Sequence, residues 1–309
     1  MNTEKPEISL VLPIFNEEES LQELFERVTK TMESLNQPYE VITIDDGSRD
    51  GSFRMLSDFH AQDKRWRVIR LTRNFGQSAA IYAGFSVSRG HYVIMIDADL
   101  QMYPEDIPLV YEKLAEGYDM VSGWRTNRKD NPFRRVMSRL LNIYTERVTG
   151  FPFHDHGCSL KGYRRTMVER MVAFTHRCRY LPVDAAMLGG NVAEVPVRHC
   201  PRQHGQSKYS VFKLFHFAFH MITTITIMPL QALSVLGIIF ALIGTTVGAY
   251  VFFVYLLSGD LIALQTIIAV LFFLAGVQLF ATGLMGEYVG RIYIETQRKP
   301  LFIIEKELD

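Results

Sequence analysis

Two aspartates separated by one residue, Asp97 and Asp99, are the pair in this sequence best suited to chemistry. They follow a short apolar run, Val93–Ile96, which is typical of a buried parallel strand. Residues two apart on a strand point to the same side, so both carboxylates should leave its carboxyl end together. Hard oxygen donors there suit Mg²⁺ or Mn²⁺, which would hold a diphosphate. A polar turn without a ligand is the alternative, and the tripeptide alone does not separate the two.

The elements that must position this pair alternate between strands and helices. The first predicted helix has Asn16 as its N-cap and Glu19 as the capping-box partner. The alternation predicts an α/β fold with a doubly wound, mostly parallel sheet. The predicted strands besides the central one cover residues 8–15, 39–44, 67–71, 120–123 and 191–198.

Polar residues gather where several of these strands end. Parallel strands end at one edge of a sheet, so these side chains should line one cleft. The sequence has no G-x-G-x-x-G after the first strand and no P-loop motif, which disfavours a dinucleotide oxidoreductase or a P-loop enzyme. The residues at these ends are Asn16, Glu17, Asp45, Asp46, Arg73, Asn74, Asp97, Asp99 and Arg125.

Two later segments contain groups that could contact a metal or an anion. The run His154-Asp155-His156 could bind a metal, although no other Cys or His spacing supports one. The loop at 202–208 is basic and contains glycine, which suits a phosphate, and a plain surface loop is the alternative. The three cysteines do not have C-x-x-C spacing and are expected to be reduced thiols of a cytosolic domain.

The last third of the chain predicts a membrane anchor. Residues 211–228 have a lysine and two histidines at helical spacing on an otherwise apolar background, which predicts an amphipathic interfacial helix. Two uncharged stretches follow, at 231–257 and 261–286, and each is long enough to span about 30 Å of hydrocarbon. Basic residues flank only the outer ends of this pair. The positive-inside rule therefore predicts a multi-pass inner-membrane protein with the catalytic domain and both termini in the cytoplasm.

The charge balance and the spacing of glycines indicate which partners this chain could bind. The sequence has 33 acidic and 33 basic residues, so nothing indicates nucleic acid as a partner. Gly244 and Gly248 form a G-x-x-x-G pattern that favours close helix packing, and a homo-oligomer is expected. The predicted parts are a cytoplasmic domain at 1–209, an interfacial helix at 210–229, two transmembrane helices within 230–290 and a cytoplasmic tail at 291–309.

Several motifs together resemble the family-two glycosyltransferases with a GT-A fold. They are LPIFNEEESL, IDDGSRDGS, RNFGQ, DADLQMYPE, DHGCSLKGYRR, GQSKYS and GEYVGRIY. Within that family the chain is similar, over nearly its whole length, to the polyprenyl-phosphate glycosyltransferases. These include bactoprenol glucosyl transferases, undecaprenyl-phosphate formamido-arabinose transferases and dolichol-phosphate mannose synthases. The resemblance implies inverting transfer of a sugar from a nucleotide sugar, expected to be UDP-linked, to polyprenyl (undecaprenyl) phosphate at the membrane.

The motifs specify the transferred sugar less strongly than they specify the reaction. The DHGCSLKGYRR and GQSKYS motifs look closest to the formamido-arabinose group, whose product serves lipid A modification. Bactoprenol glucosyl transferases tend to have Thr-Gly-Asp where this chain has Phe153-His154-Asp155. Glucose and an amino- or formamido-arabinose sugar therefore both stay open.

The resemblance also implies roles for single residues. Asp155 matches the position proposed as catalytic base, but a phosphate acceptor is already anionic, so an orienting role stays open. Asp97, Asp99 and Gln101 would hold Mg²⁺ or Mn²⁺ and the diphosphate, and Asp45 or Asp46 would hydrogen-bond the base. Pro13, Phe15, Asn16, Glu17, Ala98 and Arg125 would contact the nucleotide sugar, and Arg202, Ser207 and Lys208 the acceptor phosphate.

Two other interpretations are weighed against this one. A polysaccharide synthase of the same fold would need extra membrane spans and a Q-x-x-R-W motif, which the sequence lacks. A non-catalytic membrane scaffold could keep a degenerate nucleotide-sugar site. Intact Asp97, Asp99 and Asp155 disfavour the scaffold.

Overall fold

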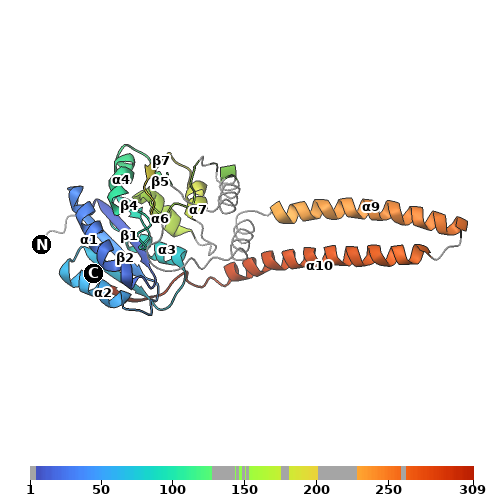
Figure 1. Cartoon of the computed structure of the whole chain (residues 1–309), viewed down its shortest axis with the longest axis horizontal. Helices are drawn as coiled ribbons and strands as arrows, with labels where there is room; N and C mark the ends of the chain where they lie inside the picture. The colour runs from blue at the N-terminus through green and yellow to red at the C-terminus, as the bar shows by residue number, and fades with distance from the viewer. Residues whose placement is uncertain are drawn as a thin grey trace. The chain divides into compact units, whose positions relative to one another are not determined.

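The computed structural model divides the chain into two compact units (Figure 1). One unit consists of Met1–Lys208 together with Lys299–Asp309, and the other of Tyr209–Arg298. The predicted basic loop at 202–208 and the predicted amphipathic helix, apart from Met228, lie outside the described residues. The structure describes residues 5–126, 143, 146–147, 150, 153–174, 181–200, 228–258 and 262–309.

A mixed eight-stranded sheet forms the centre of the first unit, in the order β7-β5-β6-β4-β1-β2-β3-β8. β1 is parallel to β2 and β4, β2 to β3, and β5 to β7. β6 is antiparallel to both β4 and β5, so β5 and β7 run in the same direction as β1 to β4. The polar strand ends predicted from the sequence therefore do share one edge. The strands are β1 (Ile8–Ile14), β2 (Tyr39–Asp45), β3 (Trp66–Leu71), β4 (Tyr92–Met95), β5 (Met120–Arg125), β6 (Lys161–Arg164), β7 (Val192–Val197) and β8 (Ile304–Leu308).

Helices pack on both faces of the sheet, as a doubly wound fold requires. Alternate residues of β1 show this, because Leu10 and Leu12 pack in one apolar cluster with Leu24 of α1. Val11 lies in the other cluster with Phe85 of α3. The helices of this unit are α1 (Glu18–Ser34), α2 (Ser52–Gln62), α3 (Gln77–Val87), the 3₁₀ helix η1 (Pro104–Asp106), α4 (Ile107–Ala115), α6 (Arg165–Ala173) and α7 (Leu181–Leu188).

Two strands depart from the sequence prediction. β6 is inserted between β4 and β5 and reverses direction within the sheet. β8 comes from the stretch expected to be a tail, and it pairs antiparallel with the edge strand β3. The chain thus leaves the catalytic sheet, forms the helical unit and returns to add its last strand.

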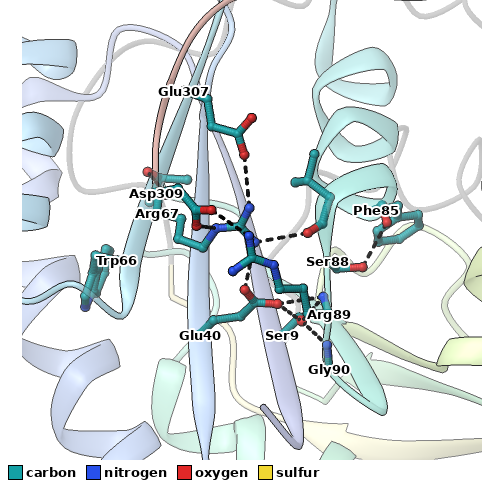
Figure 2. A network of polar contacts seen from close by, with 12 residues as sticks. Ser9, Glu40, Trp66, Arg67, Phe85, Ser88, Arg89, Gly90, Glu307 and Asp309 are labelled. Carbon is teal, nitrogen blue, oxygen red and sulfur yellow. Dashed lines mark hydrogen bonds and ion pairs between the residues drawn. The ribbon is translucent and has the colours of Figure 1, made fainter. Parts of the chain in front are cut away.

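A buried ion-pair network fastens β8 to the sheet (Figure 2). The Arg67 guanidinium lies 2.8 Å from the Glu40 carboxylate, and the two side chains are 5% and 7% exposed. Arg67 also contacts Glu307 at 3.0 Å and Asp309 at 2.5 Å. Arg89 pairs with the same Asp309 carboxylate at 2.6 Å. Arg67 therefore joins β2, β3 and the C-terminal strand through one buried cation.

The second unit contains two long helices, α9 (Met228–Ser258) and α10 (Ile262–Thr296), which contact each other (Figure 1). Within the described residues, one helix, Leu230–Leu257, is long and apolar enough to cross a membrane, with a mean hydropathy of 2.2 and none of its window buried. This agrees with the first predicted span. The second predicted span falls within α10, several of whose early side chains lie outside the described part, and it stays a prediction.

Replacing Arg67 with methionine should destabilise the catalytic unit, because Glu40 would be left buried without a counter-charge. Breaking a buried pair from one side costs about 3–5 kcal/mol, which lowers Tm by roughly 10 °C in a domain of this size. Thermal unfolding of the detergent-solubilised full chain measures the change. The matched control is Arg65→Met, because Arg65 is 43% exposed in its pairs with Glu33 and Asp63. Equal falls in Tm for the two variants would contradict the role of Arg67 as the buried counter-charge of Glu40.

Candidate active site

The loop after β1 is bound to the loop after β2. The backbone N–H of Asn16 donates to Ser48 Oγ at 3.0 Å, and the N–H of Arg49 donates to Asn16 Oδ1 at 2.8 Å. Asn16 has a left-handed backbone, with φ at 55°, and α1 begins at Glu18 without any side-chain cap. The predicted capping box of Asn16 and Glu19 is wrong, because the Asn16 amide binds the neighbouring loop instead.

Asp45 and Asp46 are both buried, and protein donors already bind their carboxylates. Asp45 Oδ1 accepts the N–H of Ser48 at 2.9 Å. Asp46 accepts the N–H groups of Phe75 and Gly76 at 2.7 and 2.9 Å. Burial raises the pKa of Asp46, and these two backbone hydrogen bonds partly offset the rise. The Asp46 carboxylate thus joins the loop after β2 to the loop after β3, and a contact of either aspartate with the nucleotide base stays a prediction.

Three more predicted nucleotide contacts lie around the end of β1. Pro13 is a partly buried residue of β1. Phe15 directly follows the strand and is 42% exposed, so its ring offers an apolar surface. The N–H of Glu17 donates to Ser52 Oγ at 3.1 Å, which adds another bond between the two loops.

Asp97 and Asp99 follow the carboxyl end of β4, as predicted, and each binds a glutamine. Asp97 Oδ1 accepts from Gln77 Nε2 at 2.6 Å, and Gln77 is the first residue of α3. Asp99 Oδ2 accepts from Gln101 Nε2 at 2.5 Å. Asp97, Asp99 and Gln101 therefore lie in one short loop, and their role as metal ligands stays a prediction.

This loop has a constrained backbone. Leu100 lies in the left-handed region with φ at 56°, which costs a non-glycine residue about 1 kcal/mol or more. The Ala98 carbonyl accepts from Ser20 Oγ of α1 at 3.1 Å. Burial of Leu100 and Ala98 and the Ser20 bond hold the turn that presents the two carboxylates.

The electrostatics of this pair fit a divalent cation. Burial, and then the neighbouring charge of Asp99, raise the pKa of Asp97 to about 6. The Ser159 hydroxyl, Gln77 and the charge of Arg125 offset part of that rise. Among the described residues no group of three or more His, Cys, Asp or Glu side chains could hold a metal. A cation here would therefore need oxygen atoms from a ligand such as a diphosphate, which is how Mg²⁺ is commonly held.

Asp155 and Arg125 form a direct ion pair that the sequence did not indicate. Arg125, the last residue of β5, donates from Nε to Asp155 Oδ2 at 2.5 Å and from its terminal nitrogen to Oδ1 at 2.9 Å. The N–H of Gly157 also donates to Asp155 Oδ1, at 3.1 Å. Hydrogen bonds to the charged form of a carboxylate make it a weaker proton acceptor. This geometry favours the orienting role for Asp155 over the role of a base.

The run His154-Asp155-His156 does not act as one metal-binding group. His154 Nδ1 lies 2.8 Å from Glu194, whereas Asp155 binds Arg125. His156 is buried with its ring 5.4 Å from that of Phe153. Within the described part of the chain both His156 ring nitrogens are without a hydrogen-bond partner. Burial, with the nearby charge of Lys161, lowers the pKa of His156 to about 4, so the ring stays neutral near pH 7.

The predicted acceptor-phosphate residues Arg202, Ser207 and Lys208 lie outside the described residues. The residues just before them contact the loop of the two aspartates, because the N–H of Cys200 donates to the Gln101 carbonyl at 2.9 Å. His199 also forms a bridge with Met102. Residues 199–200 therefore lie beside the loop that carries the two aspartates.

Sequence reasoning missed the residues that support the predicted ones. Gln77 binds Asp97, Ser159 helps to lower the pKa of Asp97, and Glu194 binds residues 154–155. The glutamine belongs to the RNFGQ motif and the serine to DHGCSLKGYRR, so both stood in motifs of interest. Glu194 stands within a predicted strand, where its alternation with apolar residues signals only an exposed face.

The sequence model of glycosyl transferase family 2 matches residues 9–172, and the chain belongs to this family. The chain is 43% identical over 308 residues to an undecaprenyl-phosphate 4-deoxy-4-formamido-L-arabinose transferase from Pseudomonas fluorescens (strain SBW25), covering 97% of this chain and 89% of the relative. These findings confirm the resemblance, and the protein is a glycosyltransferase.

Solved structures bear on the fold. A mycobacterial protein of known crystal structure matches with a TM-score of 0.50 at 16% identity, covering 71% of this chain and 75% of the other. Glucosyl-3-phosphoglycerate synthase from Mycobacterium tuberculosis, solved with Mn²⁺ and UDP, matches with a TM-score of 0.49 at 18% identity, covering 71% and 78%. The α/β fold with its mixed, mostly parallel sheet is the expected GT-A fold.

Buried neutral His156 should make stability depend on pH. Its folded pKa of about 4 lies below the ordinary 6.5, so the unfolded chain takes up the proton first as pH falls. The contribution is present above pH 6.5 and is lost towards pH 4, by up to about 3 kcal/mol. His156→Phe, which keeps a ring against Phe153, should flatten the fall of Tm between pH 7 and 4.5.

The matched control is His91→Phe, because the His91 side chain is exposed. Its curve of Tm against pH should run parallel to that of the unmodified protein. A His156→Phe curve that also ran parallel would show that this buried ring does not contribute to the acid sensitivity.

Proposed function

We propose that this protein transfers 4-deoxy-4-formamido-L-arabinose from its UDP-linked form to undecaprenyl phosphate at the cytoplasmic face of the inner membrane. The product would be a lipid-linked sugar donor for lipid A modification. The observation that carries the proposal is 43% identity across 97% of the chain to a transferase of that name. A second relative of the same name, from Aeromonas hydrophila, is 40% identical over 99% of the chain. These relatives favour formamido-arabinose over glucose.

The donor would lie along the edge where β1, β2 and β4 end. The exposed ring of Phe15 and the loops joined by Asn16 and Asp46 would hold the nucleotide, with Asp45 or Asp46 reading the base. Asp97, Asp99 and Gln101 fit Mg²⁺ or Mn²⁺ with the diphosphate. When bound, such a cation would neutralise the charge that grows on the leaving diphosphate.

The acceptor would approach from the side of β5 and the segment after Cys200. A phosphate monoester has its second pKa at about 6, so the acceptor carries its own nucleophilic charge near neutral pH. Arg202, Ser207 and Lys208 would bind the acceptor phosphate, while the Arg125–Asp155 pair orients the reacting groups. In-line attack on the anomeric carbon then inverts its configuration.

The division of the chain supports an even number of membrane crossings. Met1–Lys208 and Lys299–Asp309 belong to one unit, so both ends of the intervening segment lie on the same side of a membrane. A segment that starts and ends on one side crosses the membrane an even number of times. With α9 as one crossing, α10 would be the second, which would give the predicted hairpin of a multi-pass protein. The lipid acceptor stays in the bilayer, so this anchor brings the catalytic edge to its substrate.

Transfer from radiolabelled sugar nucleotides to undecaprenyl phosphate tests the function. Purified full chain should move label into the lipid phase from UDP-4-deoxy-4-formamido-L-arabinose in the presence of Mg²⁺ or Mn²⁺. Asp99→Asn should reduce this rate at least about a hundredfold, since it removes one of the two carboxylates that would hold the cation on the leaving diphosphate. Asp58→Asn, at an exposed position of α2, is the matched control and should retain the rate.

Each outcome of this assay bears on a different part of the proposal. Faster transfer from UDP-glucose would overturn the choice of sugar while keeping the reaction class. Absence of transfer from every sugar nucleotide, with lipid and metal present, would favour the scaffold interpretation.

Cysteine labelling tests the hairpin. In a background without native cysteines, Ser258→Cys at the end of α9 should react with a membrane-impermeant maleimide added outside intact cells. Glu305→Cys in β8 is exposed within the catalytic unit and should react only after permeabilisation. Labelling of Glu305→Cys in intact cells, or protection of Ser258→Cys, would contradict two crossings.

A further inference from the structure

A single carboxylate from β7 binds the segment that carries Asp155. Glu194 Oε2 accepts the backbone N–H of His154 at 3.0 Å and lies 2.8 Å from its Nδ1. Glu194 Oε1 accepts the N–H of Asp155 at 3.3 Å. An ionised carboxylate only accepts hydrogen bonds, so His154 Nδ1 carries the hydrogen. Glu194 thus fixes two consecutive residues through three contacts.

The His154 ring is also held from β5. The indole of Trp124 stacks on it with ring centroids 4.5 Å apart and an interplanar angle of 21°. Trp124 directly precedes Arg125, the partner of Asp155. β5 and β7 pair in register, with Ser122 opposite Glu194 and Arg125 opposite Val197. Both partners of the ion pair are therefore positioned by the same two strands.

Glu194 also contributes a negative charge near the Arg125–Asp155 ion pair. Lys161 of β6 is buried, and its Nζ donates to Ser122 Oγ at 2.7 Å. Burial lowers the pKa of Lys161, and the charges of Asp155 and Glu194 offset part of that fall whereas Arg125 adds to it, so the four groups act on one another. Two basic side chains, Lys161 and Arg125, therefore lie near two carboxylates, those of Asp155 and Glu194. Without the Glu194 charge, Asp155 would be the sole carboxylate of this group beside Arg125 and Lys161.

We propose that Glu194 is a positioning residue for sugar transfer, which holds Asp155 against Arg125 through His154 and the backbone of residues 154–155. Glu194 acts on the reaction through Asp155. The inference rests on the proposed function, because it concerns the same site. It adds a residue on β7, which β5, β6 and β4 separate from β1 and β2 in the sheet.

Glu194→Gln tests the proposal, since glutamine keeps the shape but replaces one acceptor oxygen with a donor. At least one of the three N–H groups would then face another donor, and the Asp155 loop would shift. Small misplacements in an active site reduce rates by up to about a hundredfold, so kcat should fall about ten- to a hundredfold. The KM for the UDP-sugar should stay within about twofold, because the β1 and β2 loops keep their contacts.

The matched control is Asp119→Asn. The Asp119 carboxylate accepts the N–H of Asn191 at 2.9 Å, just before β7 begins, so it perturbs the same strand at its other end. This variant should keep kcat. A shared loss of kcat in both variants would show a general effect of β7 and would overturn the role of Glu194.

The double variant Glu194→Gln/Asp155→Asn separates positioning from other effects. If Glu194 acts through Asp155, the double variant should be no slower than Asp155→Asn alone, and each loss should be uniform from pH 6.5 to 8.5. Full multiplication of the two losses, or a Glu194→Gln rate within twofold of the unmodified protein, would overturn the inference. The unmodified protein's own transfer rate tests the proposed function separately, since only ratios between variants bear on Glu194.

Discussion

The burial of Asp97 beside a second carboxylate, Asp99, is the constraint on which this edge of the sheet depends. Burial raises the pKa of Asp97, and the neighbouring charge of Asp99 adds to the rise. Compensation comes from Gln77 at the start of α3, Ser159 before β6 and Arg125 at the end of β5. Such groups can reach one point because the strands that deliver them end at the same edge.

The sequence predicted this edge well because its signals are local. Apolar runs of strand length followed by polar residues mark β1 to β5, and parallel strands must end together. It could not predict side-chain partners that depend on register across strands. The Arg125–Asp155 pair and the bond from Gln77 to Asp97 join residues 30 and 20 positions apart. Nothing in the spacing of residue types encodes such distances.

Local sequence patterns gave wrong predictions where side chains or strands form contacts with distant parts of the chain. Asn16 and Glu19 fit a capping box, but the Asn16 side chain binds the loop after β2, and its left-handed backbone ends any helical start there. The segment of β8 has alternating charges and resembles an exposed tail. Its strand exists because β3 offers an unpaired edge and Arg67 offers a buried cation. Both features lie more than 200 residues away in the sequence.

The position of β8 in the chain has a consequence for biosynthesis. A ribosome makes this strand after α9 and α10, so the nascent catalytic sheet has β3 as an open edge while the apolar helices emerge. Open edges pair readily with other chains and promote aggregation. The catalytic sheet can therefore be completed only after the helices have been synthesised. Delayed entry of the helices into the bilayer would prolong the period in which the unfinished sheet is exposed to misassembly.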